Sequence, residues 1–426
     1  MLSGLLLSFG GLLLFGLPIF AALAFAVVVA VGFWGPFDPV IVPMRMFAGM
    51  NNFSLMAIPF FILASELMRI GGLSQRLVDL ATVLVGWIPG GIAAATVLSC
   101  LFFGAISGSS PATVIAIGSI MFPALVAAGY DRFFAIGLIT VAGTLGPIVP
   151  PSIGLIIYGS VTGASVGKLF AGGVGPALLI GALLIAACVI FAIRRGYPRQ
   201  DFPTRAAFLL AVKRSAWGLG LPFLLLGGIY SGVFTPTESA AVACMYGWFV
   251  GAVIYKQIGL AELKSILKSS GAIAATLLLI TAGASAFSWL LTITGAPGSL
   301  SSQVLSNTSD PFTVAALFNI VMLVTGFFLD SASAIIVLAP LLQPIAAQVG
   351  IDPVHFGLIT VVNFSVGMLT PPVGLNLFVA MGVSKMSLRD VLRGCLPFIA
   401  IMIVALILIT YVPWITLWLP DLIYAQ

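Results

Sequence analysis

The sequence is poor in charge. Only 7% of its 426 residues are charged, whereas 61% are hydrophobic and the mean hydropathy is +1.23. A water-soluble protein of this length needs far more charge to cover its surface. One soluble core cannot absorb the apolar residues either, because such cores stop growing at about 250–300 residues. A bilayer solvates apolar side chains, so the composition predicts a membrane protein.

Residues that usually ligate catalytic metals are also scarce. His355 is the single histidine, and the four cysteines lie in apolar runs without zinc-type spacing (Cys100, Cys188, Cys244 and Cys395). We interpret these cysteines as small hydrophobic residues. There is no HExxH motif, and Asp330 lacks a second aspartate in a matching motif, which argues against an intramembrane enzyme. We therefore expect neither enzymatic activity nor a cofactor. The net charge of +5 reflects basic loops rather than a nucleic-acid surface.

Long apolar segments recur along the whole chain. The first, 5–33, is longer than the apolar region of a signal peptide and lacks a basic start, so it predicts one retained helix. The others are expected at about 53–69, 91–106, 111–128, 133–158, 169–193, 216–233, 238–255, 269–294, 312–329, 332–348, 355–380 and 395–419.

Basic residues predict the orientation. The loop 194–214 holds six basic residues against one acid, and smaller basic clusters lie at 69–76, 256–268 and 385–393. All four clusters are cytoplasmic only if 91–128 and 312–348 each leave the membrane on the side they entered. The prediction is then about nine spans plus two re-entrant hairpins, with a cytoplasmic N-terminus and a periplasmic C-terminus. Lys168 does not fit this scheme, and a bundle of ordinary spans is the alternative.

An internal repeat relates the two halves. Phe122-Pro123 is followed by Gly129-Tyr130-Asp131 and by GLIT at 137–140, while Gln343-Pro344 is followed by Gly350-Ile351-Asp352 and by GLIT at 357–360. The interval from proline to glycine is the same in both halves. With the predicted orientation, the two repeats are inverted relative to each other.

Each repeat contains a broken helix. Gly146 and Gly367 both precede a Pro-Pro pair by four residues, at 150–151 and 371–372. Proline removes a backbone donor and clashes with the preceding turn, and unsatisfied carbonyls are costly in lipid. Corresponding broken segments in two halves indicate a transporter binding site at the midplane. Two unrelated proline kinks are the alternative interpretation.

Polar residues gather at the predicted hairpin tips, 104–113 and 328–333. Hydroxyl and carbonyl oxygens there suit a small hard cation, and half-helix N-termini suit a carboxylate. Asp330 is the most specific candidate for a functional residue, because an intramembrane carboxylate is usually functional. It could hold a cation, carry a proton or cap a helix.

Two other acidic residues in apolar segments have structural interpretations. Glu238 is predicted to be the early-turn acid of a helix that begins near Thr235. Glu66 and Arg69 are predicted to form an interfacial pair.

The expected organisation has four parts. An N-terminal scaffold helix and loop occupy 1–50, and the first inverted repeat occupies 51–196 with its hairpin at 91–128 and its broken helix at 133–158. A cytoplasmic loop and central scaffold helices occupy 197–268. The second repeat occupies 269–426, with its hairpin at 312–348 and its broken helix at 355–380.

Four stretches together resemble the large membrane (M) subunit of tripartite ATP-independent periplasmic (TRAP) transporters, of the DctM and SiaM type. They are FTPTESAAV at 234–242, GAISGSSPAT at 104–113, GPIVPPS at 146–152 and GMLTPPVGLN at 367–376. The resemblance covers essentially the whole chain. It implies an ion-transporter-superfamily fold and sodium-driven symport by an elevator-like mechanism in the bacterial inner membrane. It also implies a small four-helix membrane subunit and a periplasmic protein that delivers a C4-dicarboxylate, sialic acid or related acid. The sequence shows no helices like those of the small subunit at either end, so we expect that subunit as a separate chain.

The resemblance also assigns site residues. One sodium site would use Ser107, Ser109, Gly146, Val149 and Pro151, and a second would use Asp330, Ser365, Gly367, Met368 and Thr370. Substrate would lie between the tips and the breaks, where the candidates are Ser110, Thr113, Ser333, Asn363 and Asn376. No obvious membrane-embedded arginine offers itself to a carboxylate. The residues leave open a stand-alone sodium/anion symporter of the same superfamily, and they do not name the substrate.

Overall fold

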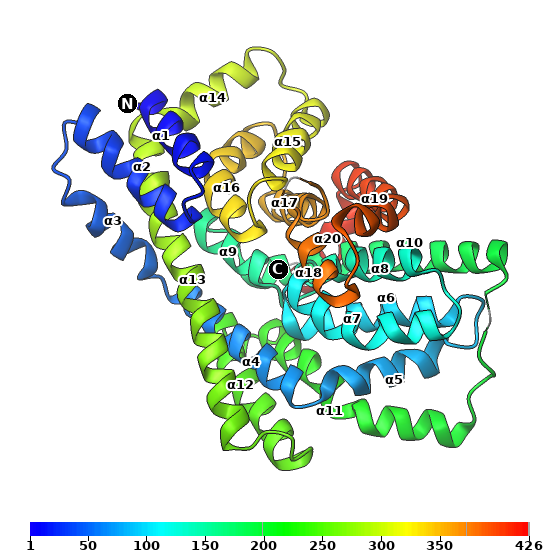
Figure 1. Ribbon diagram of the computed structural model, residues 1–426. Coiled ribbons are helices and arrows are strands. Elements are labelled where there is room, and N and C mark those ends of the chain that lie inside the picture. The colour runs from blue at the N-terminus through cyan, green and yellow to red at the C-terminus, as the bar shows by residue number, and fades with distance from the viewer. Residues whose placement is uncertain (198, 372, 425–426) are drawn as a thin grey trace.

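The chain is helical throughout the part that the structure describes. The structure is a computed structural model that describes residues 1–197, 199–371 and 373–424, and over these residues the chain forms helices and turns without strands (Figure 1). Eight of the helical segments are long and apolar enough to cross a bilayer. A helix satisfies the hydrogen-bonding capacity of its own backbone, and it must do so in a bilayer because lipid tails offer no hydrogen-bond partners. The predicted fold class, an all-α polytopic membrane protein, is confirmed.

Two runs of seven described helices follow the same order. Each begins with a spanning helix and a shorter helix, continues with the two arms of a hairpin and two half-helices, and ends with a long helix. The first run is α4 (Ala57–Ile70), α5 (Leu73–Val85), α6 (Gly91–Ser107), α7 (Ser110–Ala127), α8 (Arg132–Ala142), α9 (Ile153–Thr162) and α10 (Val166–Arg195). The second run is α13 (Leu260–Ile293), α14 (Ala296–Leu305), α15 (Pro311–Gly326), α16 (Ser331–Gln348), α17 (Pro353–Gly367), α18 (Leu375–Ser384) and α19 (Leu388–Tyr411). The hairpins α6–α7 and α15–α16 coincide with the predicted ones, whereas α13 begins before the predicted start of the second repeat at 269.

The repeated Gly-x-Asp sequence sets the same turn after each hairpin. Gly129 and Gly350 have φ of +84° and +85°, a left-handed conformation that glycine adopts without strain. Each ends its helix with the same pair of backbone hydrogen bonds, a Schellman motif. Asp131 and Asp352 then cap α8 and α17 by accepting the first free backbone N–H groups. The sequence repeat is therefore a repeat of helix-ending and helix-starting signals.

The remaining helices pack beside the repeats. They are α1 (Leu2–Leu14), α2 (Ile19–Trp34), α3 (Ile41–Met50), α11 (Arg205–Tyr230), α12 (Pro236–Phe249) and α20 (Trp414–Tyr424). Figure 1 shows the long α13 with α2 and α3 beside it, and α13 also packs against α4, which in turn packs against α12. We call α2, α3, α4, α12 and α13 the scaffold group.

Several boundaries were predicted wrongly, and α3, α5 and α14 lie outside the predicted segments. The segment 5–33 is not one helix, because Gly16 takes a φ of +77° and Pro18 follows it, so the chain turns and α1 packs against α2. The predicted loop 194–214 is helical from Arg205, where the Thr204 side chain caps the start of α11. Charged residues do not end a helix, so the basic cluster concealed this boundary.

Both breaks interrupt a helix in the middle. Between α8 and α9 the chain passes through a short 3₁₀ turn at Gly143–Leu145 and through Pro150 and Pro151; α17 ends at Gly367 and α18 begins at Leu375. Pro372 of the second Pro-Pro pair lies outside the described residues. The repeats exchange contacts across the molecule, because α7 packs against α18 and α16 packs against α9. Each half-helix after a break thus rests on the hairpin of the other repeat.

Candidate functional site

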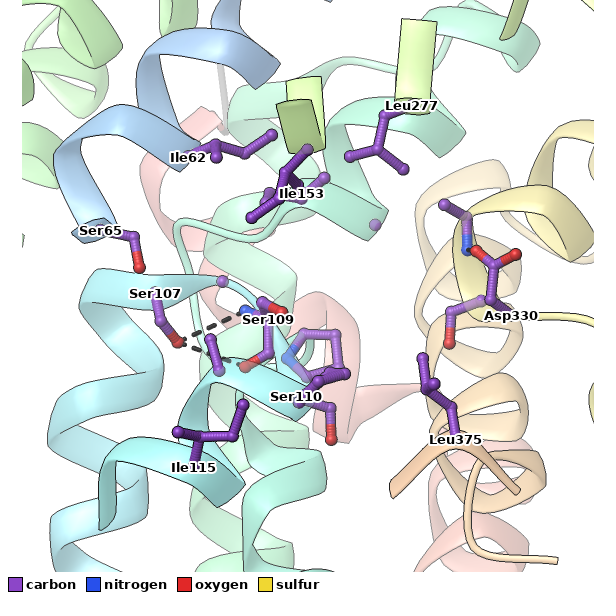
Figure 2. Close-up of a pocket in the computed structure, with 18 of the residues that line it drawn as sticks. Ile62, Ser65, Ser107, Ser109, Ser110, Ile115, Ile153, Leu277, Asp330 and Leu375 are labelled. Carbon is purple, nitrogen blue, oxygen red and sulfur yellow. Dashed lines mark hydrogen bonds between the residues drawn. The ribbon is translucent and has the colours of Figure 1, made fainter. Parts of the chain in front are cut away.

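The two hairpin tips face each other across one cavity of about 570 Å³. Figure 2 shows Ser107, Ser109 and Ser110 on one side and Asp330 on the other, with Ile62, Ser65 and Leu277 above them. One wall of the cavity is therefore formed by the hairpin tips and another by the scaffold helices α4 and α13. Among the described residues, three charged side chains line the cavity, namely Glu66, Arg69 and Asp330. The cavity thus joins the two polar tips that the sequence singled out.

The first tip is a tight polar turn. α6 ends at Ser107, Gly108 takes a φ of +58°, and α7 begins at Ser110. The Ser107 and Thr113 hydroxyls lie 3.0 Å apart, and the Thr113 hydroxyl donates to the Ser109 carbonyl at 2.8 Å. The tip therefore holds two hydroxyl oxygens and a carbonyl oxygen close together.

The first break presses against this tip through glycine. A Cβ added to Gly146 would lie 2.5 Å from the Ser109 carbonyl oxygen and 2.8 Å from the Thr113 hydroxyl. A Cβ on Gly108 would likewise lie 2.9 Å from the Pro151 carbonyl oxygen. The structure thus brings Ser107, Ser109, Gly146 and Pro151 together. Val149 lies on the same break, where its N–H donates to the Leu145 carbonyl at 2.8 Å.

The second tip is organised by Asp330. Its carboxylate caps α16, accepting hydrogen bonds from the backbone N–H groups of Ala332 and Ser333 at 3.1 and 3.2 Å and from the Ser333 hydroxyl at 2.5 Å. The capping role that the sequence left open is therefore present. Asp330 also lines the cavity, so the cap does not remove its carboxylate from the site.

The second break meets its tip as the first does. A Cβ on Gly367 would lie 2.7 Å from the Gly326 Cα, and a Cβ on Gly326 would lie 3.2 Å from the Gly367 Cα. The Ser331 hydroxyl donates to the Met368 sulfur at 3.0 Å, and both residues line the cavity. Gly104 and Gly146 form the matching close approach in the first repeat. Sequence reasoning missed both glycine pairs, although glycine in an apolar helix often signals such an approach.

The other residues predicted for the second sodium site are bonded within their own segment. The Ser365 hydroxyl donates to the Val361 carbonyl at 2.8 Å and is fully buried. The Thr370 hydroxyl donates to the Val366 carbonyl at 3.4 Å. Both belong to the segment that also holds Gly367 and Met368, and a hydroxyl that has donated its hydrogen keeps its lone pairs, so its oxygen can still accept.

Ser110 and Asn376 link the repeats. The Asn376 side-chain amide donates to the Ser110 hydroxyl at 2.5 Å, which joins the start of α7 to α18. Ser110 lines the cavity, whereas Asn376 is fully buried and its Oδ1 lacks a partner among the described residues. Of the predicted substrate-binding residues, Ser110 is the one on the cavity wall.

Thr113, Ser333 and Asn363 are fully buried behind that wall. Asn363 donates to the Asn319 side chain at 2.6 Å and to the Ile359 carbonyl at 2.9 Å, and Asn319 in turn donates to Thr410 at 3.0 Å. Asn363 therefore joins α17 to α15 and α19. Thr113 and Ser333 support the oxygens of their own tips.

The cavity includes residues that the sequence did not assign to it. Glu66 and Arg69 of α4 form the predicted ion pair, with Arg69 Nη2 at 2.7 Å from Glu66 Oε2, and both line the cavity. Thr276 and Leu277 of α13 also line it. Helical periodicity places these residues on a face of a helix but does not tell which neighbour that face meets.

Comparisons with known proteins find relatives over most of the chain. The family model described as "Tripartite ATP-independent periplasmic transporter, DctM component" matches residues 6–415. The C4-dicarboxylate TRAP transporter large permease protein DctM of Vibrio cholerae is 43% identical over 397 residues, which are 88% of this chain and 87% of that protein. The ectoine TRAP transporter large permease protein TeaC of Halomonas elongata is 36% identical over 418 residues, 97% of each protein.

The fold also resembles a solved transporter. The YdaH transporter of Alcanivorax borkumensis superimposes with a TM-score of 0.68 at 15% sequence identity, over 94% of this chain and 98% of that one. At this low identity the likeness concerns the fold alone. The overall helix arrangement is therefore shared with that structure over most of both chains.

Proposed function

The chain belongs to the DctM family of large permease subunits of TRAP transporters, and from this premise we propose that it carries a small carboxylate across the bacterial inner membrane in symport with sodium. As a permease subunit it is a multi-pass membrane protein and not an enzyme. The observation that carries the proposal is a cavity that both hairpin tips and the scaffold helices α4 and α13 line together.

A C4-dicarboxylate is the first candidate substrate, with sialic acid and related acids behind it. The relative that is 43% identical is named for C4-dicarboxylates. The cavity is of ordinary size for a small-molecule site, and α7 and α16 both begin at its wall. Helix N-termini present free N–H groups and a partial positive charge, which favour a carboxylate. The ectoine relative indicates that family membership alone does not fix the solute.

Sodium is the proposed coupling ion. The first site would use oxygens of Ser107 and Ser109 with carbonyls of Gly146, Val149 and Pro151. The second would use Asp330 with the Ser365, Gly367, Met368 and Thr370 segment. Hard oxygen donors suit a hard cation, and the close approach of Gly146 to the Ser109 carbonyl supports the first set. Asp330 supports the second, because it supplies a carboxylate at the cavity wall.

An elevator-like motion is the proposed mechanism. The hairpins and half-helices pack on one another across the repeats, whereas α4 and α13 pack within the scaffold group and meet the hairpins at the cavity. A cavity between two packed groups can open to either face when one group moves against the other. By the predicted orientation, Arg69 marks the cytoplasmic end of α4, so the described state would open inward.

The family description supplies the proposed partners. A tripartite transporter with a large permease subunit implies a small membrane subunit and a periplasmic protein that delivers the solute. The exposed apolar faces of the helices meet membrane lipid, and no nucleic acid is expected.

Reconstitution tests the proposal. The large subunit would be placed in proteoliposomes with and without its small subunit and binding protein, and uptake of radiolabelled succinate, sialic acid and ectoine would be measured. We expect uptake of at least one acid, only with both partners and an inward sodium gradient. Equal uptake by the large subunit alone would favour the stand-alone symporter, and uptake independent of sodium would contradict the coupling.

A further inference from the structure

Arg69 and Glu66 stand at the cavity in an arrangement that the proposed sites do not use. Both belong to the C-terminal part of α4, in the scaffold group, and line a cavity whose third charged residue, Asp330, comes from a hairpin tip. The sequence predicts an interfacial ion pair, and the pair is formed. The pair also lies on the cavity wall, beside the path between the two hairpin tips.

The geometry leaves the guanidinium available. Arg69 donates from Nε to Glu66 Oε1 at 3.2 Å and from Nη2 to Glu66 Oε2 at 2.7 Å, a two-point contact along one edge. An arginine has five N–H donors, so three stay free of Glu66. The Arg69 side chain is 36% exposed and Glu66 only 14% exposed. Glu66 thus holds one edge of the guanidinium while the other is open.

Arg69 differs in sign from the other charged residues on the cavity wall. Among the described lining residues Arg69 is the basic one, whereas Glu66 and Asp330 are acidic. An anion that leaves water needs a partner of opposite charge, because unpaired burial of a carboxylate is very costly. Guanidinium binds carboxylates through a planar two-point contact, and such charge-assisted hydrogen bonds are strong.

We propose that Arg69 is a carboxylate-binding residue on the scaffold side of the translocation pathway, and that Glu66 positions it. This inference rests on the proposed function, since it names the group that receives the anionic solute as it passes the hairpin tips. Glu66 neutralises Arg69 and fixes its orientation while no anion is present. An arriving carboxylate binds the open edge.

The competing explanation is a purely structural pair. On a helix, an ion pair three residues apart stabilises its own turn, and an arginine near a helix C-terminus interacts favourably with the helix dipole. A structural pair would hold its turn of α4 without binding the solute, so its loss would not slow uptake by folded protein. The ratio of thiol reaction rates with anionic and cationic reagents therefore shows whether the Arg69 charge faces the cavity, and the uptake rate separates the two explanations.

A thiol reporter measures this ratio without knowledge of the substrate. Thr276 of α13 is exposed on the cavity wall, so Thr276→Cys would be introduced after Cys244, the cysteine that is not fully buried, is replaced with Ala. Its reaction rates with an anionic and a cationic methanethiosulfonate reagent would be compared. We expect Arg69→Gln to lower the anion-to-cation rate ratio about tenfold and Glu66→Gln to raise it.

Arg76→Gln is the matched control. Arg76 is also near the predicted cytoplasmic side, but its guanidinium stacks over the Tyr255 ring at 3.6 Å and it is not among the lining residues. Its substitution should leave the ratio unchanged. If Arg69→Gln leaves the ratio unchanged as well, the proposal is overturned. Should Arg69→Gln fail to fold, Arg69→Lys decides instead through uptake, because it keeps the charge but lacks the planar two-point contact, and a wild-type rate would overturn the proposal.

Transport gives the second readout. With saturating succinate-loaded binding protein, Arg69→Gln should slow initial uptake at least about tenfold, Arg69→Lys should retain an intermediate rate, and Arg76→Gln should match the unmodified protein. Wild-type rates for Arg69→Gln would overturn the inference. Failure of the unmodified transporter to take up any acid would instead contradict the proposed function, and the thiol ratio would still report on Arg69.

Discussion

Asp330 combines a structural and a proposed functional role at one carboxylate. It caps α16 through Ala332 and Ser333, and it also lines the cavity. A capping oxygen is worth about 1 kcal/mol of stability, so a change in stability alone would not reveal a sodium ligand. The two roles can be separated by a residue that shares only one of them.

Asp330→Asn should therefore abolish or strongly weaken sodium dependence while the protein still folds. Asparagine is an equally good capping residue, but it lacks the charge that a cation requires. The sodium concentration for half-maximal uptake is expected to rise at least about tenfold, at roughly 1.4 kcal/mol per factor of ten. Uptake measured against a series of sodium concentrations checks this.

Asp310→Asn is the matched control. Asp310 caps α15 by accepting from the Thr313 N–H at 2.9 Å and from the Thr313 hydroxyl at 2.7 Å, bonds that also hold the pKa of this carboxyl below its usual value. It is not among the cavity-lining residues. Its substitution should leave the sodium dependence of uptake unchanged. Equal effects of both substitutions would reduce Asp330 to a helix cap.

At the scale of elements, the breaks depend on glycine contacts with the hairpins. Gly367→Ala places a methyl group against the Gly326 backbone, and Gly146→Ala places one against the Ser109 carbonyl. Backbone cannot move aside as a flexible side chain can, so each change should destabilise the protein by about 1–3 kcal/mol. The melting temperature of purified protein in detergent measures the loss.

Gly382→Ala is the control for these substitutions. Gly382 lies in α18, and a Cβ there would meet nothing within 4 Å. Alanine in an open helical position is neutral or stabilising by up to about 1 kcal/mol. A melting temperature as low as that of Gly367→Ala would show that the close approach is not the cause.

The Ser110–Asn376 hydrogen bond tests the exchange of contacts between the repeats. Removing one buried partner leaves the other unsatisfied, at a cost of about 1–3 kcal/mol. A double-mutant cycle with Ser110→Ala and Asn376→Ala should give a coupling energy above about 0.5 kcal/mol. Additive losses of stability would indicate that α7 and α18 meet without this bond.

Local signals account for how much the sequence predicted. The hairpins were placed closely because Gly, Ser and Pro mark their tips, and Glu238 was predicted near the start of its helix, where it completes a capping box with Thr235. The turn at Gly16 was missed because apolar residues surround it on both sides. The position of Arg69 on the cavity wall was not predicted. That position depends on which helices pack together, and a local sequence pattern does not contain this information.

At the scale of the whole molecule, the repeats build one cavity from parts far apart in the chain. Residues of α4, of both hairpin tips and of α13 line it together, although about 210 residues separate α4 from Thr276. The family relatives support a transporter, and the cavity supplies the place where a solute would pass. The central claim is that this cavity opens alternately to the two faces of the membrane.

Sided labelling of the first hairpin tip tests that claim most directly. Ala112 lines the cavity, so a cysteine introduced by Ala112→Cys reports on access to it. Cys244 would first be replaced with Ala. A membrane-impermeant thiol reagent would then be added to one face of the membrane at a time, and labelling would be measured. The account predicts labelling from the cytoplasmic face at rest, and labelling from the periplasmic face once sodium, the partner subunit and solute-loaded binding protein are present. Labelling from a single face under every condition would contradict it.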